Sequence, residues 1–135
     1  ILFALGTAWA SPMTLIGLIL GCGSLVLGAR ISISDFAIVF SGFRFFSSGA
    51  LTLGQVILFT GTNLDTPAKT YHCAAFGGDD CVRIGTHEQA HVFQYMALGI
   101  FFLPLYFLHG GISHKNRFEQ AADRYAQTGK GWWPY

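Results

Sequence analysis

The sequence predicts an α+β membrane protein in which a transmembrane helix precedes a small antiparallel β-sheet and helices that carry polar motifs. Three observations support this class. Residues 1–29 contain no charged side chain, residues 31–60 are rich in β-forming residues separated by turns, and helical motifs appear after residue 85. These differences divide the chain into a transmembrane helix at residues 1–30 and a membrane-proximal domain at residues 31–135.

Composition limits the function classes that suit this chain. Apolar residues make up 52% of the 135 residues and charged residues 11%, whereas soluble domains contain roughly 25% charged residues. The net charge is +1, so we expect no basic surface that would bind nucleic acid. These values favour the lipid bilayer as an environment and exclude a nucleic-acid partner.

The most apolar segment of the chain is MTLIGLILGCGSLVLGA, residues 13–29. A helix needs about 20 apolar residues to cross the hydrocarbon core. Ser11-Pro12 would begin the helix and Arg30 would anchor its end, whereas a signal peptide would have a shorter apolar segment. Small residues would also let helices of other membrane subunits approach closely; they are Gly17, Gly21, Gly23 and Gly28.

Two signals bear on which side of the membrane holds residues 31–135, and they oppose each other. All eight Lys and Arg residues follow Ala29, and this excess favours the cytoplasm. Cys73 and Cys81 bracket a glycine-rich loop, and a disulfide between them would need an oxidising compartment. The sequence therefore leaves the sidedness open.

Residues 31–60 are predicted to form two to four strands of the sheet. Their Val, Ile, Phe and Thr content is high, and turns are expected at Ser41-Gly42 and Ser47–Gly49. A second membrane helix over residues 36–59 is the alternative, but the charge of Arg44 and the central glycines disfavour it. Residues 61–85 are polar and glycine-rich, which predicts a loop.

Residues 86–128 are predicted to be helical. Thr86 would cap the first helix, and Gln89 would complete a capping box. Residues 92–113 are almost entirely apolar, but Pro104 interrupts them. Their length is also marginal for a span, so partial burial in the membrane is favoured over a full crossing.

The first of these helices carries the most informative motif, His87-Glu88-x-x-His91. Residues four positions apart share one helix face, so both imidazoles can bind one metal ion. The neighbouring Glu88 can act as general base towards a water molecule. A zinc site needs a third protein ligand. The only other glutamate, Glu119, supplies a candidate on a helix that Asn116 would cap and Gly129 would end.

An H-E-x-x-H helix followed by an E-x-x-A-D helix resembles the gluzincin metallopeptidases, among them the membrane-embedded CAAX-prenyl-protease and heat-shock-protease families. The chain is also similar to small bacterial membrane proteins with the patterns H-E-x-x-H-x-x-Q, L-G-x-x-F-x-P-x-Y and N-x-F-E. These patterns begin here at His87, Leu98 and Asn116. The resemblance covers about residues 50–135 and implies a bacterial inner-membrane protein.

The resemblance implies that the protein is a zinc enzyme that hydrolyses peptide bonds near the bilayer. His87, His91 and Glu119 would bind zinc, and Glu88 would be the base and proton shuttle. Asp123 would orient a ligand histidine. Residues proposed to stabilise the oxyanion or contact the substrate are Tyr125, His109 and His114.

Two further expectations concern partners. The segment Ala50–Phe59 could act as an edge strand that binds the backbone of a peptide substrate. Alternatively, the protein is a non-catalytic accessory or structural subunit of a larger integral-membrane complex, for example photosynthetic or respiratory, that retains the H-E-x-x-H fold. Its small size and the residue 13–29 helix favour that alternative. The enzyme reading differs in requiring a metal that solvent can reach.

Overall fold

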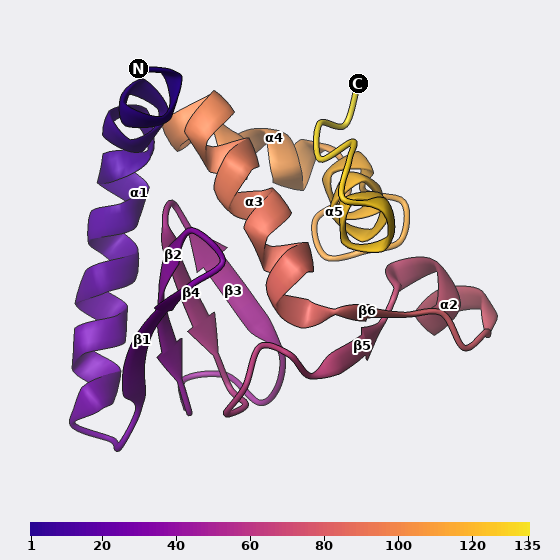
Figure 1. Cartoon of the computed structure of the whole chain (residues 1–135). Coiled ribbons are helices and arrows are strands. Elements are labelled where there is room, and N and C mark those ends of the chain that lie inside the picture. The colour runs from indigo at the N-terminus through magenta and orange to yellow at the C-terminus, as the bar shows by residue number, and fades with distance from the viewer.

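A computed structural model describes all of residues 1–135 as a mixed α+β protein (Figure 1). The helices are α1 (Leu2–Leu25), α2 (Tyr71–Phe76), α3 (Ile84–Leu98), the 3-10 turn η1 (Gly99–Phe101), α4 (Phe102–Leu108) and α5 (Arg117–Thr128). The strands are β1 (Arg30–Ser34), β2 (Ala37–Ser41), β3 (Ala50–Leu53), β4 (Val56–Phe59), β5 (Pro67–Lys69) and β6 (Cys81–Arg83).

Helix α1 lies within the predicted residues 1–30, but it begins at Leu2 rather than at Ser11-Pro12, so Pro12 lies inside it. A proline inside a helix leaves the carbonyl four residues earlier without its backbone donor. Here the Ser11 hydroxyl donates to the Ala8 carbonyl at 2.7 Å and supplies that missing donor. Trp9 packs against Phe101 of η1, which extends the contacts of the helix towards its start.

One face of α1 packs along the sheet, and its glycines make this close approach possible (Figure 1). A Cβ atom on Gly21 would lie 2.3 Å from the Phe40 ring, and one on Gly17 would lie 2.7 Å from Cβ of Val56. These two glycines, expected to face partner helices, therefore face the protein's own sheet. Only Gly23 in this helix has no neighbour within 4 Å.

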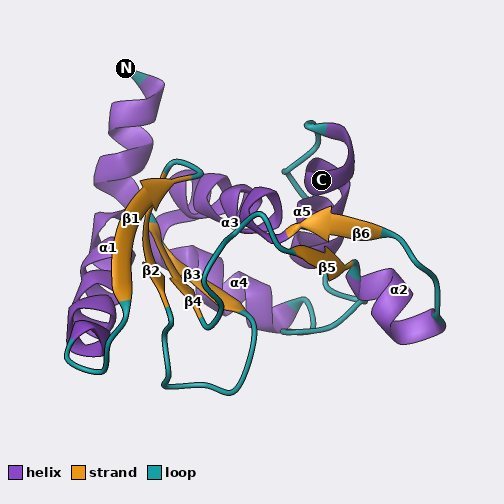
Figure 2. Ribbon diagram, turned by 60° about the horizontal axis from the view of Figure 1, so that its bottom comes forward, coloured by secondary structure: helices purple, strands orange, loops and turns teal.

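The main sheet has four strands in the order β1-β2-β4-β3 (Figure 2). The expectation of a purely antiparallel sheet was wrong, because β2 and β4 pair in parallel. Strand β4 has the sequence VILF and is buried at every position, so it lies inside the sheet. Strand β3 pairs only with β4 and forms an edge, as expected for the first half of Ala50–Phe59.

The sheet contributes to two apolar clusters on its opposite faces. Phe40 packs in a cluster with Met13 of α1. On the other face, Val39 and Ile57 pack with Val92 of α3. Helix α1 and the sheet therefore share one core, so α1 is a packed part of the domain.

The predicted loop at residues 61–85 contains short regular elements instead. β5 and β6 pair as an antiparallel two-stranded ribbon, and α2 is part of the connection that joins them (Figure 2). Thr70 caps α2, because its side chain accepts a hydrogen bond from the Cys73 backbone at 3.2 Å. The proposed disulfide is not formed: Cys73 is buried in α2, Cys81 is exposed at the start of β6, and both thiols are free.

Helix α3 begins at Ile84, two residues before the predicted cap. Thr86 lies in the first turn, where its hydroxyl accepts a hydrogen bond from Arg83 at 3.3 Å. Arg83 occupies the cap position, and Asp35 and Asp65 hold its guanidinium at 3.0 and 2.6 Å. The long-range ion pairs that form here were not visible in the local sequence.

The apolar stretch after α3 bends before it continues. Gly99 adopts a positive φ of 56°, and the chain passes through η1 into α4, whose first turn holds Pro104. By length and composition, Leu2–Leu25 and the helical stretch Ile84–Leu108 are each apolar enough to cross a membrane. The second stretch is more buried within the protein than the first.

The contact between α1 and the sheet can be tested with matched alanine substitutions. Gly21→Ala should lower the free energy of unfolding by about 1–3 kcal/mol, because the added methyl group displaces the Phe40 ring. Gly23→Ala should raise it by up to about 1 kcal/mol, because alanine favours the helix and nothing lies nearby. Denaturant unfolding in detergent measures both. Equal changes in the two variants would contradict this packing.

Candidate metal centre

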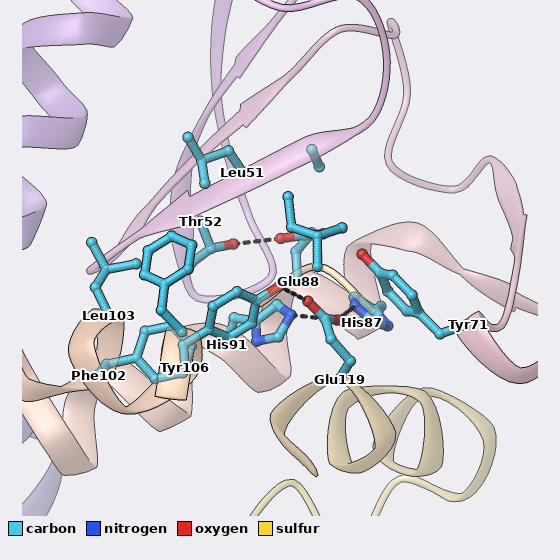
Figure 3. Close-up of a pocket in the computed structure, with 13 residues that line it drawn as sticks. Leu51, Thr52, Tyr71, His87, Glu88, His91, Phe102, Leu103, Tyr106 and Glu119 are labelled. Carbon is cyan, nitrogen blue, oxygen red and sulfur yellow. Dashed lines mark hydrogen bonds and ion pairs between the residues drawn. The ribbon is translucent and has the colours of Figure 1, made fainter. Parts of the chain in front are cut away.

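The three predicted ligands, His87, His91 and Glu119, meet in one buried group between α3 and α5 (Figure 3). Nε2 of His87 lies 3.0 Å from Oε2 of Glu119, and Nε2 of His91 lies 3.3 Å from the same oxygen. The ligand atoms are all within 4.8 Å of one another. This group could bind a metal ion.

Glu119 is positioned by the capping of α5. The Asn116 side chain accepts a hydrogen bond from the Phe118 backbone at 3.0 Å, as the sequence predicted for this helix start. Its amide also donates to the backbone carbonyls of Tyr106 and Gly111 at 3.0 and 2.7 Å. The cap therefore ties the start of α5 to α4, and Glu119 follows one turn later. Gly129 ends α5 in the left-handed region, also as predicted.

Asp123 holds His87 from behind, one helical turn after Glu119. Its Oδ1 lies 2.9 Å from Nδ1 of His87, and its Oδ2 accepts a hydrogen bond from the Tyr71 backbone at 2.7 Å. A carboxylate accepts hydrogen bonds, so the Nδ1 proton of His87 points at Asp123. Once a metal ion displaces the Nε2 proton, the Nε2 lone pair of His87 is free to bind it.

Gln94 performs the same task for His91. Its Oε1 lies 2.7 Å from Nδ1 of His91, while its Nε2 donates to the carbonyls of Phe118 at 3.2 Å and Trp132 at 2.8 Å. Two carbonyl acceptors require the amide nitrogen on their side, so Oε1 must face the imidazole. The Nδ1 atom of His91 is therefore a donor, and its Nε2 atom also faces the site.

The donor set fits a divalent metal. Nε2 of His87, Nε2 of His91 and Oε2 of Glu119 converge on one point. When both rings are neutral with their protons on Nδ1, all three atoms present lone pairs there and repel one another. A cation at this point removes the repulsion. Two histidine nitrogens and one carboxylate oxygen are a common three-ligand set for zinc. The Tyr106 hydroxyl donates to Oε1 of Glu119, which leaves Oε2 for the ion.

The local charges keep Glu119 ionised. Burial alone would raise the pKa of its carboxyl, but the adjacent His91 and His87 lower this pKa well below its ordinary value. By contrast, burial and the nearby carboxylates of Glu119 and Glu88 raise the pKa of Tyr71. Glu119 is therefore an anionic group that suits a cation, and Tyr71 is a protonated hydrogen-bond donor at neutral pH.

Glu88 lies beside the three predicted ligands, but its carboxylate makes no hydrogen bond to them. Its Oε2 accepts a hydrogen bond from the Thr52 hydroxyl of β3 at 2.7 Å (Figure 3). Glu88 and the three ligands line one cavity, together with residues of β3 and α4. The other lining residues include Leu51, Tyr71, Phe102, Leu103, Tyr106 and Phe107.

The three predicted oxyanion or substrate contacts do not line this cavity. Tyr125 donates to Gln89 at 3.0 Å on the other side of α3. Nδ1 of His109 bonds to the Leu105 carbonyl at 2.8 Å within its own helix end, and His114 packs on Phe76 of α2.

Two tyrosines to which the sequence assigned no role lie in the cavity instead of these three residues. Tyr71 and Tyr106 both line the cavity (Figure 3). Tyr106 ends the L-G-x-x-F-x-P-x-Y pattern, so the sequence contained a signal for it. Tyr71 belongs to no motif, and only the packing of α2 against α5 brings it to the site.

Comparison with known proteins finds no matching family model, no matching curated protein and no matching solved structure.

The metal content of the purified protein tests the three-ligand group. We expect near one metal ion per chain in the wild type and loss of the ion in His91→Ala and Glu119→Ala, since either change removes a ligand. Glu88→Gln is the matched control and should keep its metal, because Glu88 contacts Thr52 rather than the ligands. Elemental analysis after dialysis gives the count. A wild type that stays metal-free after incubation with zinc would exclude the site.

Proposed function

We propose that this protein is a membrane-anchored zinc metallopeptidase of the gluzincin type, which hydrolyses peptide bonds near a bilayer. The observation that carries the proposal is the position of Glu88. Its carboxylate lines the same cavity as His87, His91 and Glu119 without being one of the ligands. A base beside a three-ligand metal group is the arrangement that metal-assisted hydrolysis requires.

The chain's own residues divide the reaction between them. Bound zinc would supply a Lewis acid that polarises the scissile carbonyl and makes water more acidic. Glu88 accepts the proton of the attacking water and returns it to the leaving amine. The hydrogen bond from Thr52 orients this carboxylate. Tyr71, protonated at neutral pH, is suited to donate to the oxyanion that develops on the carbonyl.

Strand β3 supports binding of an extended peptide. Across the hairpin, the Thr60 backbone donates to the Gly49 carbonyl at 3.1 Å. Because ladder bonds alternate along a strand, the backbone groups of Ala50 and Thr52 point away from β4 towards the open edge. Both residues line the cavity. A peptide that adds to this edge would pass beside Glu88 and the ligands.

The outward face of α1 supports contact with lipid. Its side chains are apolar and exposed, for example Leu15 at 60% and Ile19 at 72%. The inward face packs on the sheet from Ala10 to Ser24. An upright α1 would carry the open sheet edges into hydrocarbon, where unpaired backbone groups are costly. We therefore propose that α1 lies along the membrane, with its outward face in lipid.

The alternative function is that of a non-catalytic subunit of a larger membrane complex. The packing of α1 disfavours a complex in which helices of other subunits approach the glycines of α1. Gly17 and Gly21 are already covered by the sheet. A partner could reach only the outward face of α1, where large exposed side chains accompany a single open glycine, Gly23, rather than a small-xxx-small pair for close helix packing.

Peptide hydrolysis by the zinc-loaded protein tests the enzyme proposal. Glu88→Gln should lower the hydrolysis rate by about 10²–10⁴-fold with an unchanged zinc content, because the base is lost and the ligands remain. A library of apolar fluorogenic peptides in detergent micelles measures the rate. If the zinc-loaded wild type hydrolyses none of the peptides faster than Glu88→Gln does, the catalytic role of Glu88 is wrong, while the metal site is unaffected.

Flotation with phospholipid vesicles tests the membrane contact. The double variant Leu15→Gln and Ile19→Gln should float less than the wild type, since two apolar side chains on the outward face of α1 are lost. The control is Phe76→Gln on α2, which also removes an exposed apolar side chain and should float like the wild type (Figure 1). An equal loss in both variants would argue for non-specific binding.

A further inference from the structure

The segment Lys130–Tyr135, here called the aromatic strap, follows α5 and folds back over the protein without helix or strand (Figure 1). It is nevertheless held firmly. Arg124 donates to the Gly131 carbonyl at 2.8 Å and to the Trp133 carbonyl at 3.0 Å. The Trp132 ring lies 5.9 Å from that of Phe93 on α3. The strap therefore joins α5 to α3.

One hydrogen bond connects the strap to the metal centre. The Trp132 carbonyl accepts from Nε2 of Gln94 at 2.8 Å, and the Gln94 oxygen faces Nδ1 of His91 at 2.7 Å. Gln94 is fully buried at 0% exposure. Loss of the strap carbonyl would leave one N–H of this amide without its acceptor, and such a group is costly in a buried place.

Loss of the Trp132 carbonyl would also affect the predicted ligand His91. With both carbonyls present, the Gln94 amide has one favourable orientation, and His91 keeps its proton on Nδ1. With the Trp132 carbonyl gone, the amide loses half of that restraint and can rotate its nitrogen towards His91. The proton of His91 then favours Nε2, which is the nitrogen that would bind the metal.

We propose that the aromatic strap is a latch on the metal centre, which sets the metal affinity through Gln94 and the tautomer of His91. The inference rests on the metal-binding part of the proposed function and is independent of peptidase activity. A partner or a protease that displaces the strap would weaken metal binding without touching a ligand. Gln94 is a positioning residue in this scheme.

The experiment compares zinc affinity, measured by competition with a chromophoric chelator, in a small set of variants. A chain ending at Lys130 and the variant Gln94→Met should each bind zinc about 10–100-fold more weakly, the range typical for residues that support a metal-ligating histidine. The two changes together should be no worse than Gln94→Met alone, because they break the same connection. Tyr135→Phe, which keeps the Trp132 carbonyl, should bind like the wild type.

Two further measurements separate this role from a merely structural one. Nitrogen NMR of the metal-free protein, recorded at a pH high enough for the His91 ring to be neutral, should show the proton on Nδ1 in the wild type and shifted towards Nε2 in the shortened chain. If the shortened chain does not fold by circular dichroism, Gly131→Ala replaces it. Gly131 has a positive φ of 77°, which alanine rarely adopts, and a Cβ there would lie 2.7 Å from the Nε atom of the Arg124 side chain that holds the strap, so this change strains the strap in a full-length chain.

The outcomes are distinct. Wild-type affinity in the folded shortened chain, or in Gly131→Ala when that variant replaces it, would overturn the latch and leave the metal centre intact. Losses that multiply in the double variant would also overturn it, because the strap would then act by another route. A wild type that binds no zinc would overturn the metal centre and the latch together.

Discussion

The structure depends on one buried convergence, in which two imidazole nitrogens point at a single carboxylate oxygen between α3 and α5. A buried carboxylate without a compensating charge is strongly unfavourable. In the metal-free protein the compensation comes from the His87 and His91 rings, whose Nε2 atoms donate hydrogen bonds to the carboxylate, and a metal ion would take the place of those protons. Most of the polar contacts in this region serve to aim these three groups.

The residues that position the site come from separate parts of the chain, and each fixes the orientation of one group. Asn116 sets the start of α5, Asp123 and Gln94 orient the two rings, and Tyr106 occupies the spare oxygen of Glu119. Precision of this kind is what distinguishes a metal-ready group from a chance meeting of polar residues. It also explains why the site lies on helices rather than on loops.

The three members of the candidate metal group could be predicted from the sequence because two of them share a local spacing and the third is a rare residue type in this chain. His87 and His91 lie one helical turn apart, and Glu119 was the only other glutamate available. Strands in residues 31–60 were likewise visible as β-rich segments between turns. The parallel pairing of β2 and β4 was not visible, because it depends on the fully apolar β4 taking an interior position. Tyr71 was missed for a similar reason, since its place depends on α2 packing rather than on spacing.

The position of the ligands on two separate helices has a consequence for the lifetime of the protein. An ion held by His87, His91 and Glu119 would act as a staple between segments 28 residues apart in the chain. Each tenfold rise in free metal above the dissociation constant would stabilise the folded state by about 1.4 kcal/mol. The supply of metal in the cell would then govern how much of the protein survives proteolysis, in addition to how much of it is active.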